Sequence, residues 1–228
     1  MKDIWTLVSE EASVEKEIEL VIYAKIGNID GLQQASEKIH QREIIGNMIV
    51  PGLDKPQRWR IRETNDHSYE FTIKKRVENS QGLSEFNEEN VTVNRDLWNT
   101  MRHCASKAHD KYRYVFIAEN VTLSYRHKDF EDAREAVIPK LKYEVDVYLP
   151  PNSSEPKWCK IDIELQDALA YLEKNFPEIN KAKVNISVSH LPFKPVNVIL
   201  SSDPDPQKQQ ILGQVWDFQF NLKPSDLR

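Results

Sequence analysis

The sequence predicts an α+β protein built on a closed antiparallel β-barrel, a tunnel, with helices packed outside it. Many segments alternate between apolar and polar residues with a period of two, which is typical of strands with one buried face. The polar faces are sorted by charge, because some carry only cations and others carry paired carboxylates. A closed barrel with a polar interior would place these charges across a tunnel from one another. The alternative is an ordinary half-buried sheet with a charged outer face.

The composition is that of a single domain. The chain has 228 residues, and its net charge of −5 leaves acidic and basic residues nearly balanced. This size fits one domain, residues 1–228. The nearly balanced charge does not indicate a DNA partner. Cys104 and Cys159 form no Cys-x-x-Cys pair, and no stretch has the apolar length of a signal peptide or a membrane span. We therefore expect a soluble, cytoplasmic protein without a membrane partner.

The first predicted strand, Val14 to Lys25, has an acidic face. Because successive side chains point to opposite sides, Glu15, Glu17 and Glu19 share this face with Val21, and the other face is mostly apolar. Neighbouring carboxylates on it lie about 7 Å apart and repel by roughly 2 kcal/mol at an effective dielectric of 20. Water, cations from other strands or a metal ion must offset this repulsion.

Two further strands form a predicted hairpin with a cationic face. Arg58 to Glu63 and Tyr69 to Arg76 both alternate between polar and apolar residues, and the turn Thr64-Asn65-Asp66 joins them. The cations on their polar faces are Arg58, Arg60, Arg62, Lys74 and Arg76.

The other segments up to residue 176 complete the predicted element order. Before and after the hairpin we expect a short amphipathic helix at Asp30 to Glu43, a turn-rich connection at Gly46 to Gln57, and an exposed loop at Val77 to Asn90. Then follow a helix at Arg95 to Asp110, strands at Lys111 to Ile117 and Val121 to Arg126, and a partly helical segment at His127 to Ile138. Strands at Lys140 to Leu149 and Lys157 to Leu165 precede a helix at Asp167 to Phe176, which Pro177 ends.

The C-terminal segment is less regular. Val184 to Leu191 and Val196 to Leu200 are predicted strands, Pro204 to Val215 a short helix, and Trp216 to Leu222 an alternating segment. The pattern does not place these elements on the main sheet.

The charged faces indicate a phosphate and metal site. Two carboxylate pairs, Glu17 with Glu19 and Asp162 with Glu164, offer the hard oxygen ligands that Mg²⁺ and Mn²⁺ prefer. Arginine and lysine side chains on the facing strands would hold phosphate oxygens through charge-assisted hydrogen bonds.

The order of these motifs resembles that of the CYTH, or triphosphate tunnel metalloenzyme, superfamily. The motifs are Glu17-Ile-Glu19, Arg60-Ile-Arg62, Thr72-Ile-Lys74, Lys111-Tyr-Arg113 and Asp162-Ile-Glu164, followed by the helix from Asp167. The resemblance covers a core at residues 14–176 and leaves a C-terminal extension at 177–228 unexplained. It implies an eight-stranded antiparallel tunnel that binds triphosphate groups together with a divalent metal.

The sequence departs from the family pattern at two positions. Val21 stands where the first family motif continues to a lysine, and Lys25, further along the same face, could substitute for it. Asp162 stands where the closing motif usually has a glutamate. Glu144 and Asp146 on the preceding strand offer an alternative acidic pair, so the sequence leaves open which pair completes the metal site.

The resemblance implies a hydrolase for a triphosphate-containing small molecule or an RNA 5′ end, with Mg²⁺ or Mn²⁺ as cofactor. The catalytic residues that it implies are Glu17, Glu19, Arg60, Arg62, Lys74, Lys111 and Arg113. The implied phosphate-binding residues are Arg58, Arg60, Arg62, Lys74, Arg76, Lys111, Arg113 and Arg126. The implied metal ligands are Glu17, Glu19, Asp162 and Glu164, with Glu144 and Asp146 as alternatives. The competing hypotheses are a tunnel that binds phosphorylated nucleotide or RNA without turnover, and a structural β protein.

Overall fold

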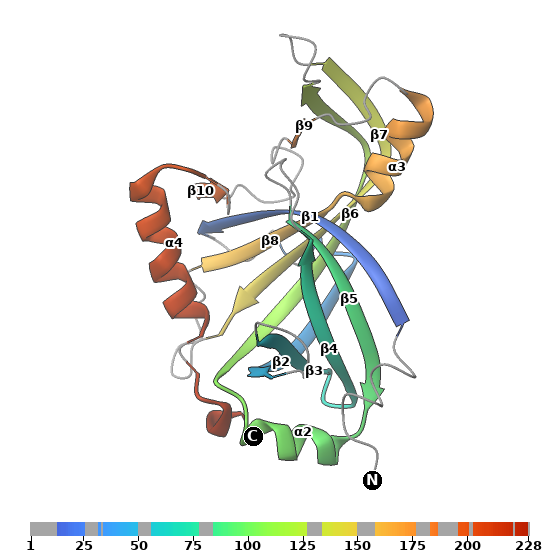
Figure 1. The fold of residues 1–228 in the computed structure, drawn as a ribbon. Coiled ribbons are helices and arrows are strands. Elements are labelled where there is room, and N and C mark those ends of the chain that lie inside the picture. Colours follow the sequence, from blue (N-terminus) through green and yellow to red (C-terminus); the bar gives the residue numbers. More distant parts are fainter. Residues whose placement is uncertain are drawn as a thin grey trace.

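The computed structural model of the chain has the predicted α+β architecture (Figure 1). It describes residues 13–25, 32, 34–49, 56–77, 84–126, 134–149, 158–176, 183–186, 196–200, 203–220 and 222–227. The strands are β1 (Ser13–Lys25), β2 (Glu37–Met48), β3 (Gln57–Thr64), β4 (Ser68–Val77), β5 (Ser84–Val93), β6 (Lys107–Arg126), β7 (Arg134–Tyr148), β8 (Trp158–Glu164), β9 (Lys183–Ile186) and β10 (Val196–Leu200). The helices are α2 (Arg95–Arg102), α3 (Gln166–Asn175), α4 (Pro206–Gln219) and the 3₁₀ turn η4 (Pro224–Asp226).

All strand pairs are antiparallel, and the pairing returns to the strand where it starts. The order runs β1, β5, β4, β3, β2, β6, β7, β8, and β8 pairs with β1 as well as with β7. The β1–β8 register places Val21 opposite Asp162, and the β1–β5 register places Glu15 opposite Glu88. The C-terminal strands add to this sheet, because β10 pairs with the end of β1 and β9 pairs with β6.

The apolar strand faces point outward to the helices, as the alternation predicts. Leu20 and Ile22 of β1 belong to a core that also contains Ala168 and Leu172 of α3. A second core joins β2, β3 and β4 to α2. Figure 1 shows α2 across one end of the sheet and α4 beside the edge formed by β10, β1 and β8. The charged faces of the strands are therefore left to line the interior.

Gly46 lets β2 pass closely over the second core. A Cβ atom added to Gly46 would overlap the indole ring of Trp59, which is fully buried and stacks on Phe71 with ring centroids 6.2 Å apart. Only a residue without a side chain allows this approach.

Two sequence predictions are wrong because each concerns a strand with a polar inner face. The segment predicted as a helix, Asp30 to Glu43, instead contributes the first half of β2. The predicted loop, Val77 to Asn90, contains most of β5. In β5 the interior residue Glu88 is buried opposite Lys74 of β4, so a polar stretch that suggested exposure belongs to the sheet.

Several element boundaries also differ. The helix predicted at Arg95 to Asp110 ends at Arg102, because the chain from Lys107 onward pairs with β2. The two strands predicted within residues 111–126 are one strand, β6, and the positive φ of 53° at Asn120 lies inside it. β7 begins at Arg134, so the described part of His127 to Ile138 is extended and not helical.

The C-terminal predictions are partly confirmed. The predicted strand Val196 to Leu200 and the helix near Pro204 to Val215 are β10 and α4. Trp216 lies in α4, so the segment predicted to alternate from that residue begins as helix. In the part of the chain that the structure describes, no helix has both the length and the apolar character needed to cross a membrane.

Candidate functional site

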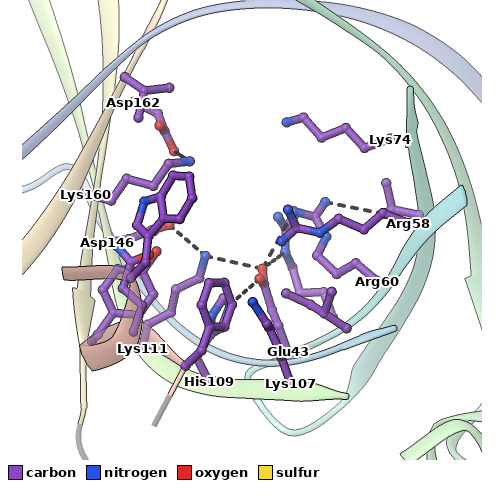
Figure 2. Close-up of a pocket in the computed structure, with 18 of the residues that line it drawn as sticks. Glu43, Arg58, Arg60, Lys74, Lys107, His109, Lys111, Asp146, Lys160 and Asp162 are labelled. Carbon is purple, nitrogen blue, oxygen red and sulfur yellow. Dashed lines mark hydrogen bonds and ion pairs between the residues drawn. The ribbon is translucent and has the colours of Figure 1, made fainter. Parts of the chain in front are cut away.

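A cavity of about 680 Å³ is lined by residues of β1, β2, β3, β4, β6, β7 and β8, and α4 contributes to its lining (Figure 2). Eight cationic side chains and four carboxylates of the described residues line it. The cations are Arg58, Arg60, Arg62, Lys74, Lys107, Lys111, Arg113 and Lys160. The carboxylates are Glu19, Glu43, Asp146 and Asp162. This excess of cationic over acidic side chains in the lining favours a polyanionic ligand.

The strand alternation brings most of the predicted phosphate-binding residues together. Six of them line the cavity, from three strands: Arg58, Arg60 and Arg62 on β3, Lys74 on β4, and Lys111 and Arg113 on β6. The side chains of Arg76 and Arg126 lie outside the described residues. These six side chains thus line one cavity.

Only part of the predicted metal-ligand set faces the cavity. Glu19 and Asp162 line it from the neighbouring strands β1 and β8, and the side chain of Glu17 lies outside the described residues. Glu164 and Glu144 are instead bridged by Lys142, whose Nζ lies 2.9 Å from Glu164 Oε1 and 2.6 Å from Glu144 Oε1. Lys142 thus neutralises both of these carboxylates.

Asp146 belongs to a compact ion cluster with two cations of β6. Its Oδ2 accepts a hydrogen bond of 2.6 Å from Lys111 Nζ, and Arg113 donates to its two oxygens at 2.7 and 2.8 Å. Arg113 also pairs with Glu144. Burial alone would raise the pKa of Asp146, but Arg113 and Lys111 hold it below its ordinary value. Asp146 therefore acts as a structural counter-ion, since both of its oxygens are occupied.

Glu43 of β2 is a site residue that the sequence reasoning missed, because that segment was predicted as a helix. Its Oε1 lies 2.8 Å from Arg62 Nε, 3.3 Å from Lys111 Nζ and 3.9 Å from Arg60 Nη1. Burial would raise the pKa of Glu43, but Lys111, Arg60 and Arg62 hold it well below its ordinary value. Glu43 thus stays ionised and fixes the cations around it (Figure 2).

His109 of β6 completes the surroundings of Glu43. Its Nε2 lies 2.5 Å from Glu43 Oε2, and its ring packs between Tyr148 and Phe220 with centroids 5.3 Å from each. Burial lowers the pKa of His109 more than Glu43 raises it. We therefore take the imidazole as neutral near pH 7, with its Nε2–H donated to Glu43.

Arg60 is among the cations least committed to the protein. Its closest described carboxylate is Glu43 at 3.9 Å, its contact with the Thr72 hydroxyl is a long 3.4 Å, and its Nε has no hydrogen-bond partner. Arg58 beside it forms no ion pair with a carboxylate of the described residues. Guanidinium groups in this position have donors left for a ligand anion.

The carboxylate of Asp162 has unused bonding capacity. Lys160 Nζ donates to Oδ2 at 2.6 Å, while the buried Oδ1 has no partner. Burial raises the pKa of Asp162 to about 6, and the nearby charges of Glu19 and Asp146 add to this, although Lys160 opposes it. One oxygen of this buried carboxylate is therefore left without a partner in the protein.

The structure tests Asp162 and Glu19 as ligands for a divalent metal. In the residues that the structure describes, no three carboxylate, histidine or cysteine side chains gather as a complete site. The unpartnered Oδ1 of Asp162, with Glu19 close enough to raise its pKa, nevertheless fits a hard cation. Glu164 and Glu144 fit less well, because Lys142 already holds them.

The lysine expected near Val21 comes from a different strand. Val21 lines the cavity, but Lys25 is exposed and lies over the Trp158 ring at 5.1 Å, outside the cavity lining. The ammonium group close to Glu19 and Asp162 belongs to Lys160. The suggestion that Lys25 substitutes is therefore wrong.

Comparisons with solved structures found likenesses with low sequence identity, of which two are described. One is to the structure described as the putative adenylyl cyclase HpAC1 from Hippeastrum, with a dominant triphosphatase activity, at 12% identity and a TM-score of 0.39, over 76% of this chain and 91% of that chain. The other is to the hypothetical protein NE1496, at 14% identity and a TM-score of 0.32, over 67% of this chain and 81% of that chain.

No family model matches the sequence, and no curated protein matches it. Because both structural likenesses have TM-scores below 0.5, we base no functional argument on them. The function is therefore argued from the cavity itself.

Proposed function

We propose that this chain is a metal-dependent phosphohydrolase that acts on a triphosphate group of inorganic triphosphate, a nucleoside triphosphate or an RNA 5′ end. The observation that supports this most directly is the cavity lining, in which cationic side chains outnumber carboxylates by eight to four. In Figure 2, Lys74, Arg58 and Arg60 lie on the wall opposite Asp162. A chain of phosphates could contact the cationic wall while a metal ion on the acidic wall meets the same phosphates.

We infer that the eight strands from β1 to β8 form a closed tunnel around this cavity. The support is the pairing of β1 with both β5 and β8, which joins the two ends of the strand order. A closed wall keeps bulk water away from the charges and strengthens their action on a bound phosphate.

The proposed cofactor is Mg²⁺ or Mn²⁺. Asp162 and Glu19 would hold it, and Glu17 would join them from the same face of β1. When bound, such an ion polarises phosphate oxygens and lowers the pKa of a coordinated water.

The cations of the cavity divide into two roles. Arg58, Arg60 and Lys74 would contact the phosphates directly and neutralise charge that develops during transfer. Lys111 and Arg113 are committed to Asp146, so they would set the position and the field of the site. Glu43 and His109 would keep the cavity cations in place.

A second candidate function is binding of a phosphorylated nucleotide or RNA with weak or no turnover. One contact favours it. Lys160 Nζ lies 2.6 Å from Asp162 Oδ2, so an ammonium group already occupies the carboxylate that a metal would take. Val21 offers no cation of its own at that place.

One experiment separates the two functions. The protein is incubated with tripolyphosphate, ATP, thiamine triphosphate or triphosphorylated RNA, each with Mg²⁺ or Mn²⁺, and the products are analysed for phosphate, pyrophosphate and cyclic AMP. For an enzyme we expect metal-dependent phosphate release that the double variant Glu19→Gln, Asp162→Asn loses. Glu119→Gln, an exposed carboxylate of β6, is the matched control.

The other outcomes are equally informative. Retained binding without any product would favour the second function. If wild type neither binds nor hydrolyses any of the four compounds, both proposals are wrong.

A further inference from the structure

One end of the cavity is aromatic and not cationic. Helix α4 contributes Trp216 and Gln219 to the cavity lining, Phe220 follows directly after the helix, and β1 and β7 contribute Tyr23 and Tyr148. The helix is anchored by its other residues, because Leu212 and Val215 are buried and pack with Ile199 of β10 in a separate apolar cluster. Trp216 and Phe220, four positions apart, share a stripe of this segment.

The aromatic rings at this end differ in how much of their surface is covered by contacts within the protein. Phe220 stacks on His109 and lies under Lys107, whose Nζ is 4.7 Å from the ring centroid. Tyr148 is buried and packs edge-on against His109. The surfaces of both rings are therefore already covered by contacts within the protein.

Trp216 is the exception. Its side chain lines the cavity and yet is 54% exposed, and it is the one aromatic side chain among the large apolar residues that the described part of the chain leaves exposed. Tyr23 lines the same end of the cavity, so the indole has another aromatic residue beside it in the lining. An exposed ring at a cavity lining is a ready stacking surface.

The size of the cavity agrees with a ligand larger than three phosphates. Its volume of about 680 Å³ is in the range of cavities that hold drug-sized ligands. Arg58 provides the link between the two ends, because its charge acts on both Tyr23 and Tyr148. A ligand could thus run from the cationic wall to the aromatic end without leaving the cavity.

We propose that Trp216 forms a subsite for a planar aromatic group attached to the triphosphate, so that the substrate class is a triphosphate ester with a base-like ring and not inorganic triphosphate. This inference rests on the proposed function, because it assumes that the cationic wall holds the phosphates. The ring of the ligand stacks on the exposed face of the indole. Stacking of this kind is sequence-tolerant, so both purine and pyrimidine bases fit it.

Calorimetric titration with ATP and with tripolyphosphate tests this subsite, using metal-free buffer so that turnover does not consume the ligand. The variants are Trp216→Ala, Trp216→Phe and, as a control, Ile117→Ala, an exposed apolar residue outside the cavity lining. Loss of stacking on one base typically costs about 5-fold to 150-fold in affinity. We expect Trp216→Ala to weaken ATP binding by this factor and to leave tripolyphosphate binding within about twofold of wild type. Trp216→Phe should keep most of the ATP affinity, and Ile117→Ala should bind both compounds as wild type does.

The outcomes that contradict the subsite are distinct from those that contradict the proposed function. If Trp216→Ala leaves ATP binding unchanged, or weakens ATP and tripolyphosphate equally, the subsite is wrong while the phosphate site stands. If wild type binds neither compound, the proposed function fails and the subsite fails with it.

Discussion

The imidazole of His109 and the carboxylate of Glu43 form a buried hydrogen-bonded pair, with Nε2 and Oε2 2.5 Å apart. The other oxygen of the same carboxylate faces Arg62 and Lys111. One acidic residue from β2 therefore connects a neutral ring to the cations of two other strands. The electrostatics of the cavity depend on this connection.

Replacing Glu43 with glutamine should have opposite effects on stability and on ligand affinity. Removing its charge leaves Lys111, which is 3% exposed, with less compensation, and breaking a buried pair in this way costs about 3 kcal/mol or more. The cavity also becomes more positive, so tripolyphosphate should bind more tightly. Thermal unfolding with and without tripolyphosphate measures both effects: a lower Tm without ligand and a larger upward shift with it. Glu119→Gln should change neither, and an unchanged Tm for Glu43→Gln would contradict this role.

Arg60→Ala and Arg113→Ala should affect different properties. Arg60 has donors left for a ligand, so its loss should weaken polyphosphate binding by roughly 10-fold to 100-fold, the value of one or two charge-assisted hydrogen bonds, with a small change in stability. Arg113 is held by Asp146 through two hydrogen bonds, so its loss should lower the free energy of unfolding by about 3 kcal/mol or more. Urea denaturation and calorimetry on both variants check this division. Equal effects on both properties in both variants would speak against it.

His109 should make the protein less stable in mild acid. Burial lowers the pKa of His109 in the folded state, whereas the unfolded chain titrates near the ordinary value of 6.5. As the pH falls below 6.5, the unfolded state takes up a proton that the folded state does not, so the free energy of unfolding decreases. Glutamine at this position keeps an N–H donor but does not titrate. Urea denaturation between pH 5 and pH 8 should therefore show a smaller loss for His109→Gln than for wild type, and parallel curves would rule the effect out.

Two glycines should respond in opposite ways to the same substitution. Gly46→Ala places a methyl group against the Trp59 indole. Overpacking a core in this way typically lowers the free energy of unfolding by about 1–3 kcal/mol. Gly213 lies in the interior of α4 with no neighbouring atom within 4 Å of an added Cβ, so alanine there should stabilise the protein by about 0.5–1 kcal/mol. The free energy of unfolding from urea titration decides both signs. A stabilising Gly46→Ala would show that β2 lies further from Trp59.

Alternation predicted the strands whose two faces differ most in polarity. In β3, Trp59 and Ile61 are buried between Arg58, Arg60 and Arg62, and the period of two is plain in the sequence. The cationic faces of β3, β4 and β6 and the outward apolar faces follow directly from it. The order of the charged motifs then placed Arg60, Lys74 and Asp162 in one cavity.

The pattern failed where the two faces are alike. In β2, polar residues stand on both faces between Glu37 and Glu43, so no period of two is visible there, and the helix predicted over this segment concealed Glu43. In β5 the polar residues face a polar interior, which sequence reasoning takes for solvent. His109 and Lys160 were out of reach for another reason, since their roles come from neighbours on other strands that no local spacing reveals.

The two partners of β1 also determine when the cavity can exist during folding. Glu19 of β1 pairs with Ser84 of β5 and with Glu164 of β8, two strands that are far apart in the sequence. Long-range pairings of this kind carry a large loop-closure entropy and form slowly. Glu19 and Asp162 become neighbours only when β1 pairs with β8, so the acidic wall depends on this long-range pairing.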